Sequence, residues 1–203
     1  MRRVLIACLL VWLAPAPAGA TGAGDLHAPR PAVLARALRA FERVEAAGRV
    51  RNRLLTVIDY ALPSSSRRLW VLEPESREIL FQEFVAHGKG SAPERNPDRA
   101  VRFGNQGGSF RSSLGTFLTG EAYRGEHGYS LRLEGLEPGV NDRAAERAIV
   151  IHPADYVGKA FRLRSGGRLG RSWGCPALDP DVAPQIIDRI QSGSVIFAYG
   201  SDS

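Results

Sequence analysis

The chain has 203 residues, of which 44% are hydrophobic and 24% are charged, and its formal net charge is +6 at pH 7. Its 27 basic residues are nearly all arginine and lie scattered among 21 acidic ones, which argues against a nucleic-acid-binding protein. After the first twenty residues no stretch is long and apolar enough to cross a membrane, and the length suits one domain.

The first twenty residues have the pattern of a secretory signal peptide. Arg2 and Arg3 form a positive start, residues 4–14 are apolar, and residues 18–20 supply small side chains for cleavage. The apolar run is too short to span a bilayer, which needs about 20 residues. We therefore expect an exported protein of the periplasm or cell envelope, with no membrane insertion after removal of residues 1–20. Loss of the two arginines would lower the formal charge from +6 to +4.

Residues 21–31 are rich in Gly, Ala and Pro, which predicts a short flexible lead before a single domain over residues 32–203. Apolar residues then recur at helical spacing from Leu34 to Val44, and Gly48 stands where a helix would end. This pattern predicts an N-terminal amphipathic helix that packs on the domain.

Short β-branched and aromatic runs predict strands along most of the remaining chain. The second and third runs are separated by turn residues and predict a hairpin, and a long loop rich in glycine and serine follows them. The predicted strands are residues 54–60, 69–72, 79–86, 116–119, 130–133, 148–152 and 195–199.

A second helix is predicted near the C-terminus, with Asp179 as its cap, Pro180 in its first turn and Gly193 at its end. Its buried residues would be Val182, Ile186, Ile187 and Ile190. The elements together predict a mainly β domain with two or three helices and no internal repeat.

Cys175 is the one cysteine that remains once Cys8 leaves with the signal peptide. A single thiol in an exported protein has no intramolecular disulfide partner, and Gly174 and Pro176 allow the chain to turn sharply beside it. A cysteine nucleophile needs a base that takes its proton and donors that hold the oxyanion. We interpret Cys175 as a reactive group.

His152 is the leading candidate for the base. It ends the apolar run 148–152, and the tip of a buried strand is a rigid place from which to present a catalytic side chain. Spacing alone leaves a second interpretation, in which His152 only hydrogen-bonds a loop carbonyl. His127 is a rival base that could instead line a substrate groove, while His87 also ends a predicted strand.

Two segments carry the strongest motif: Ile-His at residues 151–152 and Gly-Arg-Ser-Trp-Gly-Cys at residues 170–175. Together with segments 85–91, 112–115 and 127–133, they resemble the L,D-transpeptidases of the YkuD type, and more closely the murein L,D-transpeptidase catalytic domain branch. The resemblance covers nearly all of the chain after the first helix. It implies a mainly β (α+β) fold, a mixed β-sandwich or barrel with an N-terminal and a C-terminal helix.

The resemblance also implies an activity. Such an enzyme cleaves the L,D bond of peptidoglycan tetrapeptide stems through a Cys175 thioester, releases D-alanine and transfers the acyl group to an amine of a neighbouring stem. Its partners would be stem peptides, carbapenems and penems would inhibit it covalently, and it would need no cofactor. An L,D-carboxypeptidase or a protein-to-stem ligating enzyme would use the same residues. A non-catalytic peptidoglycan-binding module is the alternative from another class, and it is disfavoured because both His152 and Cys175 are present.

Residues beside the thiol have two interpretations each. Ser172 could orient His152 through its hydroxyl or carbonyl, or it could satisfy the backbone of its own turn. Gly174 would allow close backbone approach, so that its N–H and that of Cys175 form the oxyanion hole. Trp173 could stack over the stem or anchor the packing of the loop.

The chain also departs from the wider family. Trp173 stands where that family has a histidine, and Pro176 and Ala177 follow the cysteine where it has an apolar residue and an arginine. The expected guanidinium must come from elsewhere, with Arg171 as the nearest candidate, or the chain does without it. Ser113 could contact the stem or cap a loop, so the candidate substrate-binding residues are His127, Arg171, Trp173 and Ser113. The histidines are too widely spaced to predict a metal site.

Overall fold

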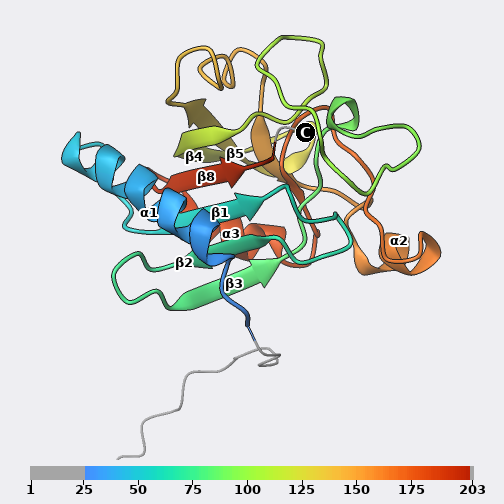
Figure 1. The fold of residues 1–203 in the computed structure, drawn as a ribbon, viewed down its shortest axis with the longest axis horizontal. Helices are drawn as coiled ribbons and strands as arrows, with labels where there is room; N and C mark the ends of the chain where they lie inside the picture. Colours follow the sequence, from blue (N-terminus) through green and yellow to red (C-terminus); the bar gives the residue numbers. More distant parts are fainter. Residues whose placement is uncertain (1–25, 202–203) are drawn as a thin grey trace, which may run out of the picture.

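Eight strands form one sheet in a computed structural model that describes residues 26–201 (Figure 1). The strand order is β3-β2-β1-β8-β4-β5-β6-β7, and all neighbours are antiparallel except the parallel pairs β1–β8 and β6–β7. The elements are α1 (Pro31–Ala46), β1 (Leu55–Asp59), β2 (Leu69–Leu72), β3 (Ile79–Glu83), the 3₁₀ turn η1 (Lys89–Ser91), β4 (Gly115–Gly125), β5 (Gly128–Gly135), β6 (Val150–Pro153), α2 (Lys159–Arg164), β7 (Ala177–Leu178), α3 (Ala183–Ile190) and β8 (Val195–Tyr199). The predicted signal peptide and Cys8 lie outside the described residues.

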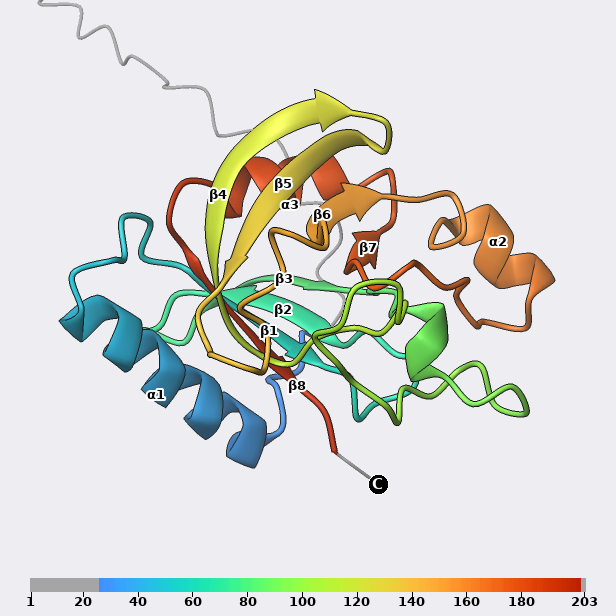
Figure 2. The same cartoon turned by 90° about the horizontal axis from the view of Figure 1, so that it is seen from above.

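The sheet is nearly closed on itself. An isolated bridge between Ala86 and Ala177 joins the segment after β3 to β7, which is the opposite end of the strand order. The long hairpin of β4 and β5 is strongly curved, and both strands contact α3 (Figure 2). The expected mainly β fold, a mixed sandwich or barrel, is therefore confirmed.

Helix α1 covers one face of the sheet and forms as its sequence pattern predicts (Figure 1). It begins at Pro31, where the missing N–H costs no helical hydrogen bond. Its apolar stripe, which includes Phe41 and Val44, packs on the side chains of β1, β2 and β8 that face it, such as Trp70 and Val195. Strand β1 is buried along its whole length because both of its faces are covered.

Helix α3 packs against the opposite part of the core, but it begins later than predicted. Its N-cap is Val182, not Asp179. Asp179 instead closes the preceding turn, because its carboxylate accepts the N–H of Asp181 at 3.1 Å and its carbonyl accepts that of Ala183 at 2.9 Å. Ile186, Ile187 and Ile190 are buried as predicted, whereas Val182 is half-buried and the helix ends before Gly193.

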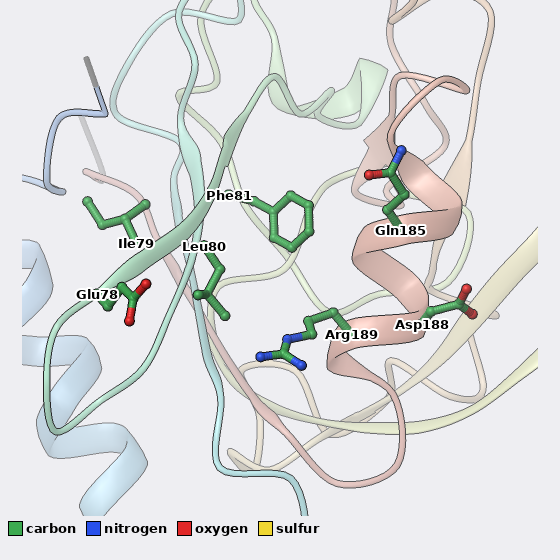
Figure 3. Close-up of a pocket in the computed structure, with 7 residues that line it drawn as sticks. All are labelled: Glu78, Ile79, Leu80, Phe81, Gln185, Asp188 and Arg189. Carbon is green, nitrogen blue, oxygen red and sulfur yellow. The ribbon is translucent and has the colours of Figure 1, made fainter. Parts of the chain in front are cut away.

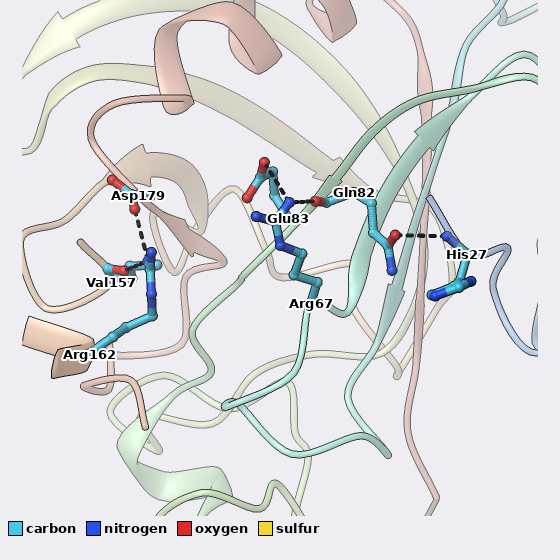
Figure 4. Close-up of polar contacts among 7 residues, drawn as sticks. All are labelled: His27, Arg67, Gln82, Glu83, Val157, Arg162 and Asp179. Carbon is cyan, nitrogen blue, oxygen red and sulfur yellow. Dashed lines mark hydrogen bonds and ion pairs between the residues drawn. The ribbon is translucent and has the colours of Figure 1, made fainter. Parts of the chain in front are cut away.

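Strands β4 and β5 extend further than predicted, and α2 and β7 were not predicted. The guanidinium of Arg162 in α2 donates to Asp179 at 2.8 Å and also to the carbonyl of Val157 (Figure 4). These bonds attach α2 to the connection between β7 and α3. No helix within residues 26–201 has the length and apolar character needed to cross a membrane.

Residues 26–30, the part of the predicted lead that the structure describes together with Pro31, are hydrogen-bonded to the sheet. The N–H of His27 donates to Gln82 in β3 at 3.0 Å (Figure 4), and its carbonyl accepts the indole N–H of Trp70 at 2.6 Å. Arg30 pairs with the buried carboxylate of Asp59 at 2.7 Å. The segment before α1 thus contributes to the anchoring of α1 on the sheet.

Candidate active site

Cys175 and His152 line the same cavity, which has a volume of about 250 Å³. The walls come from the β4–β5 turn, the end of β6 and the loop before β7. The lining residues are Glu126, His127, His152, Tyr156, Arg171, Ser172, Trp173 and Cys175. The cavity therefore unites segments that lie up to 49 positions apart in the sequence, from Glu126 to Cys175.

Strand pairing explains why the thiol and the imidazole share this cavity. In the parallel ladder of β6 and β7, His152 lies opposite Ala177, and Cys175 comes two residues before Ala177. The pairing of β6 with β7 therefore brings the bend that carries Cys175 beside the strand that carries His152.

His152 is held in one tautomer. Its Nδ1 lies 2.9 Å from the carbonyl oxygen of Pro153, and because a carbonyl only accepts, Nδ1 carries the proton. The other nitrogen, Nε2, therefore has a free lone pair. Burial lowers the pKa of His152 below its ordinary value, the hydrogen bond to Pro153 opposes this shift, and the neighbouring His127, whose ring centroid lies 4.7 Å away, adds to it. At neutral pH His152 is a neutral base.

Cys175 is a buried neutral thiol. Its Sγ donates to the carbonyl of Ala148 at 3.6 Å, and only 9% of the residue is exposed. Burial raises the pKa of Cys175 above its ordinary value of 9.0, while the backbone of Val150 and the charge of Arg147 act in the opposite direction. A raised thiol pKa beside a lowered imidazole pKa describes a neutral pair instead of a preformed ion pair.

Arg147 is the guanidinium next to the thiol, and sequence reasoning missed it. Its Nη1 donates to the carbonyl of Gly104 at 2.8 Å and to Ser113 Oγ at 2.6 Å, and its Nη2 donates to the carbonyl of Arg111 at 2.6 Å. Burial lowers the pKa of Arg147, and the proximity of Cys175 opposes this shift. In the sequence Arg147 lies in a run of alternating charges that resembles an ordinary surface, so no local signal marks it.

The turn before the thiol is built around Ser172. Its hydroxyl donates to the carbonyl of Cys175 at 2.6 Å and accepts the N–H of Gly174 at 3.1 Å. Both bonds are to backbone groups of its own turn, as in the second interpretation of Ser172 given above. Because the Gly174 N–H is already engaged, the Cys175 N–H is the remaining donor of the two expected in the oxyanion hole.

Gly174 could not be any other residue without strain. Its φ is +125°, and a Cβ there would lie 2.8 Å from the carbonyl oxygen of Arg111 and 3.2 Å from Nη2 of Arg147. The glycine thus allows the turn of residues 172–175 to pack directly on Arg111 and Arg147.

The family model of the L,D-transpeptidase catalytic domain matches residues 27–199. The chain belongs to this family. The resemblance predicted from the motifs is therefore confirmed, and the match includes both Cys175 and His152.

Solved structures similar to this L,D-transpeptidase domain include two L,D-transpeptidases and a cell shape determining protein. An L,D-transpeptidase from Mycobacterium smegmatis is 17% identical, with a TM-score of 0.43, over 73% of this chain and 59% of that one. An LD transpeptidase in complex with imipenem gives the same values. A helical cell shape determining protein from Campylobacter jejuni is 12% identical, with a TM-score of 0.48, over 82% of this chain and 56% of that one. The chain thus spans less than two thirds of these structures, and no curated protein matches it.

The other expected substrate-binding residues of the L,D-transpeptidase domain fall into two groups. His127, Arg171 and Trp173 line the cavity, and Trp173 is 70% exposed. Ser113 does not line it, because this residue is buried and its hydroxyl donates to Gly104 and accepts from Arg147. Ser113 therefore supports the guanidinium and does not face the cavity.

Larger hollows lie elsewhere on the domain. One of about 500 Å³ lies between β3 and α3, where Leu80, Phe81 and Arg189 point into it (Figure 3). Another of about 620 Å³ lies beside α2, between this helix and residues 179–181. Neither is lined by a cysteine or a histidine, so the candidate site is the smaller cavity beside Cys175, chosen by the chemistry of its side chains. Within residues 26–201 no cluster of His, Cys, Asp or Glu side chains could hold a metal ion.

Buried polar side chains also support the turn of residues 172–175. The carbonyl of His87 accepts the N–H of Ser172 at 3.0 Å, and the His87 Nδ1 accepts from Nη2 of the fully buried Arg68 at 2.8 Å. Burial is the main cause that lowers the pKa of His87 to about 3, with the charge of Arg68 next. His87 thus holds the turn through its backbone carbonyl, and its imidazole is uncharged at neutral pH.

This neutral histidine makes the domain sensitive to acid. An unfolded histidine gains a proton near pH 6.5, whereas His87 in the folded protein does so only near pH 3. The free energy of unfolding should therefore be unaffected above pH 6.5 and fall by up to about 1.4 kcal/mol per pH unit below it. We expect His87→Gln to flatten this slope in urea unfolding between pH 7 and pH 4. His27→Gln, at an exposed position, serves as the control, and equal slopes for the two variants would contradict the prediction.

Proposed function

We propose that the protein is an exported cysteine acyltransferase that cleaves the L,D bond of peptidoglycan tetrapeptide stems and transfers the acyl group to an amine of a neighbouring stem. One observation carries the proposal: the Cys175 thiol and His152, whose Nε2 is free, line one cavity in a domain of the L,D-transpeptidase family. The site of action would be the periplasm or cell envelope.

Acylation uses the neutral pair directly. As Sγ of Cys175 attacks the carbonyl carbon of the third stem residue, Nε2 of His152 takes the thiol proton. The Cys175 N–H stabilises the oxyanion that forms. Collapse breaks the C–N bond, and the His152 imidazolium gives its proton to the departing amine of D-alanine. The product of this step is a thioester on Cys175.

Deacylation repeats the proton transfer in the opposite sense. The amine of a second stem attacks the thioester carbonyl, and His152 takes a proton from it. The C–S bond breaks, the new amide is released, and the proton returns to the sulfur. Water in place of the amine gives an L,D-carboxypeptidase, and an amine on a protein gives a protein-to-stem ligating enzyme.

The lining of the cavity supports this assignment. His127, Arg171 and Trp173 would contact the stem, and Arg147 would favour the thiolate-like sulfur of the transition state. Carbapenems and penems present a strained acyl group to the same sulfur, so they should acylate Cys175. No step calls for a cofactor. A non-catalytic binding module would have no use for a base held in one tautomer beside a thiol.

Products distinguish these reactions. Incubation of the purified domain with disaccharide-tetrapeptides should release D-alanine and give crosslinked dimers, measured by mass spectrometry. Tripeptides without dimers would identify a carboxypeptidase. The absence of both D-alanine release and new products would contradict the proposed function.

A further inference from the structure

An ammonium group lies against two aromatic rings at the rim of the cavity. Nζ of Lys89 is 4.2 Å from the ring centroid of Phe110 and 5.3 Å from that of Trp173. The two ring centroids are 5.4 Å apart. Because Trp173 also lines the cavity of Cys175, these three residues connect the cavity to the surface beside it.

The backbone holds this group in place. The Lys89 N–H donates to the carbonyl of Ser172 at 2.8 Å, and the Gly90 N–H donates to that of Phe110 at 2.9 Å. Phe110 has a φ of +53°, an unfavourable value for a bulky aromatic residue. A Cβ at Gly90 would lie 2.1 Å from the Ser109 carbonyl, so glycine is needed for the loop to approach. The aromatic ring is thus fixed beside the ammonium at an energetic cost.

The charge of Lys89 has no ion-pair partner in the part of the chain that the structure describes. Among the ion pairs of residues 26–201 none involves Lys89, and none involves Arg171. Glu126 is the one acidic residue that lines the cavity. The cavity and its rim therefore carry an excess of positive charge. An ammonium on π faces is attracted to the rings but keeps N–H donors for an anion.

We propose that Lys89, positioned by Phe110 and Trp173, binds a carboxylate of the peptide substrate and thereby sets substrate specificity. The inference rests on the proposed function, because a peptide stem supplies the carboxylate. Two sources are compatible with the position: the terminal carboxylate of the leaving residue, and a side-chain carboxylate of an upstream residue. A charge-assisted hydrogen bond to either one would favour the free acid over its amide.

Equilibrium binding tests this without turnover. In a Cys175→Ala background, Lys89→Met should weaken the binding of a tetrapeptide roughly tenfold in calorimetry, and Lys89→Arg should retain most of the affinity. Lys159→Met is the matched control, because Lys159 on α2 is the other of the two lysines and lies outside the cavity. Two further peptides carry a carboxamide, one at the C-terminus and one on the side chain.

The peptides identify the source of the carboxylate. The effect of Lys89→Met should disappear with one of the two amidated peptides, and that peptide names the group that Lys89 binds. An effect that persists with both, equal affinities for Lys89→Met and Lys159→Met, or no binding at all would overturn the inference. D-alanine release by protein that retains Cys175 tests the proposed function separately, so release with no dependence on Lys89 would reject the inference alone.

Discussion

The Cys175→Ala protein should fold and release no D-alanine from tetrapeptide stems. Without the sulfur no thioester forms, so acyl transfer should fall by roughly 10⁴-fold or more. The variant loses one weak hydrogen bond to Ala148 and little volume, so its free energy of unfolding should change by about 1 kcal/mol. D-alanine release and urea unfolding of the same preparation measure the two effects.

A mass measurement gives the control for this result. Intact protein treated with a carbapenem should gain the mass of one inhibitor, and the Cys175→Ala variant should gain none. Cys175→Ser keeps a polar hydrogen near the Ala148 carbonyl and should match the stability of the original protein more closely. Residual D-alanine release by the alanine variant would show that another group is the nucleophile.

His152→Ala and Arg147→Gln should separate proton transfer from charge stabilisation. His152→Ala should lower acyl transfer by about 10²- to 10⁴-fold, because the thiol and the amine both lose their base. It should leave the pH midpoint of Cys175 alkylation unchanged, since burial lowers the pKa of His152 while that of Cys175 is raised above 9.0, and the imidazole is neutral where the thiol ionises. Alkylation by iodoacetamide, followed by intact mass, measures the midpoint.

Arg147→Gln should have the complementary effect. The charge of Arg147 lowers the pKa of Cys175, so its removal should shift the alkylation midpoint to higher pH. Arg143→Gln removes an exposed charge four residues away that pairs with Glu146, and it is the matched control. A midpoint that rises in His152→Ala but not in Arg147→Gln would indicate an imidazolium–thiolate pair and contradict the neutral-pair description.

Periodic patterns predicted the sheet elements and helices with long apolar runs. Helix α1 and strands β1, β2 and β8 could be located because their burial follows the spacing of their own residues. Helix α2 buries no residue and β7 has two residues, so neither leaves a periodic signal. The start of α3 was misplaced because Asp179 and Pro180 have the chemistry of a helix start but form a separate turn.

The candidate site was predictable only where a motif is local. Cys175 and His152 stand in recognisable segments, whereas Arg147 acquires its place through bonds to Gly104 and Arg111, more than 35 positions away in each case. Lys89 likewise meets Trp173 only because the preceding residue, Gly88, forms a bridge with Ser172. Contacts of this kind arise from tertiary structure, and a single sequence carries no sign of them.

The position of β8 has a consequence for how the domain folds. It is the last strand along the described chain, yet it lies between β1 and β4, with parallel pairing on one side and antiparallel pairing on the other. Before residues 195–199 have been synthesised, β3-β2-β1 and β4-β5-β6-β7 have no strand between β1 and β4 to join them, and only the bridges at Ala86–Ala177 and Gly88–Ser172 link the two groups at the other end. Pairing of β1 with β8 closes a loop of well over one hundred residues, which makes folding slow. The complete sheet can therefore form only after β8 has left the ribosome.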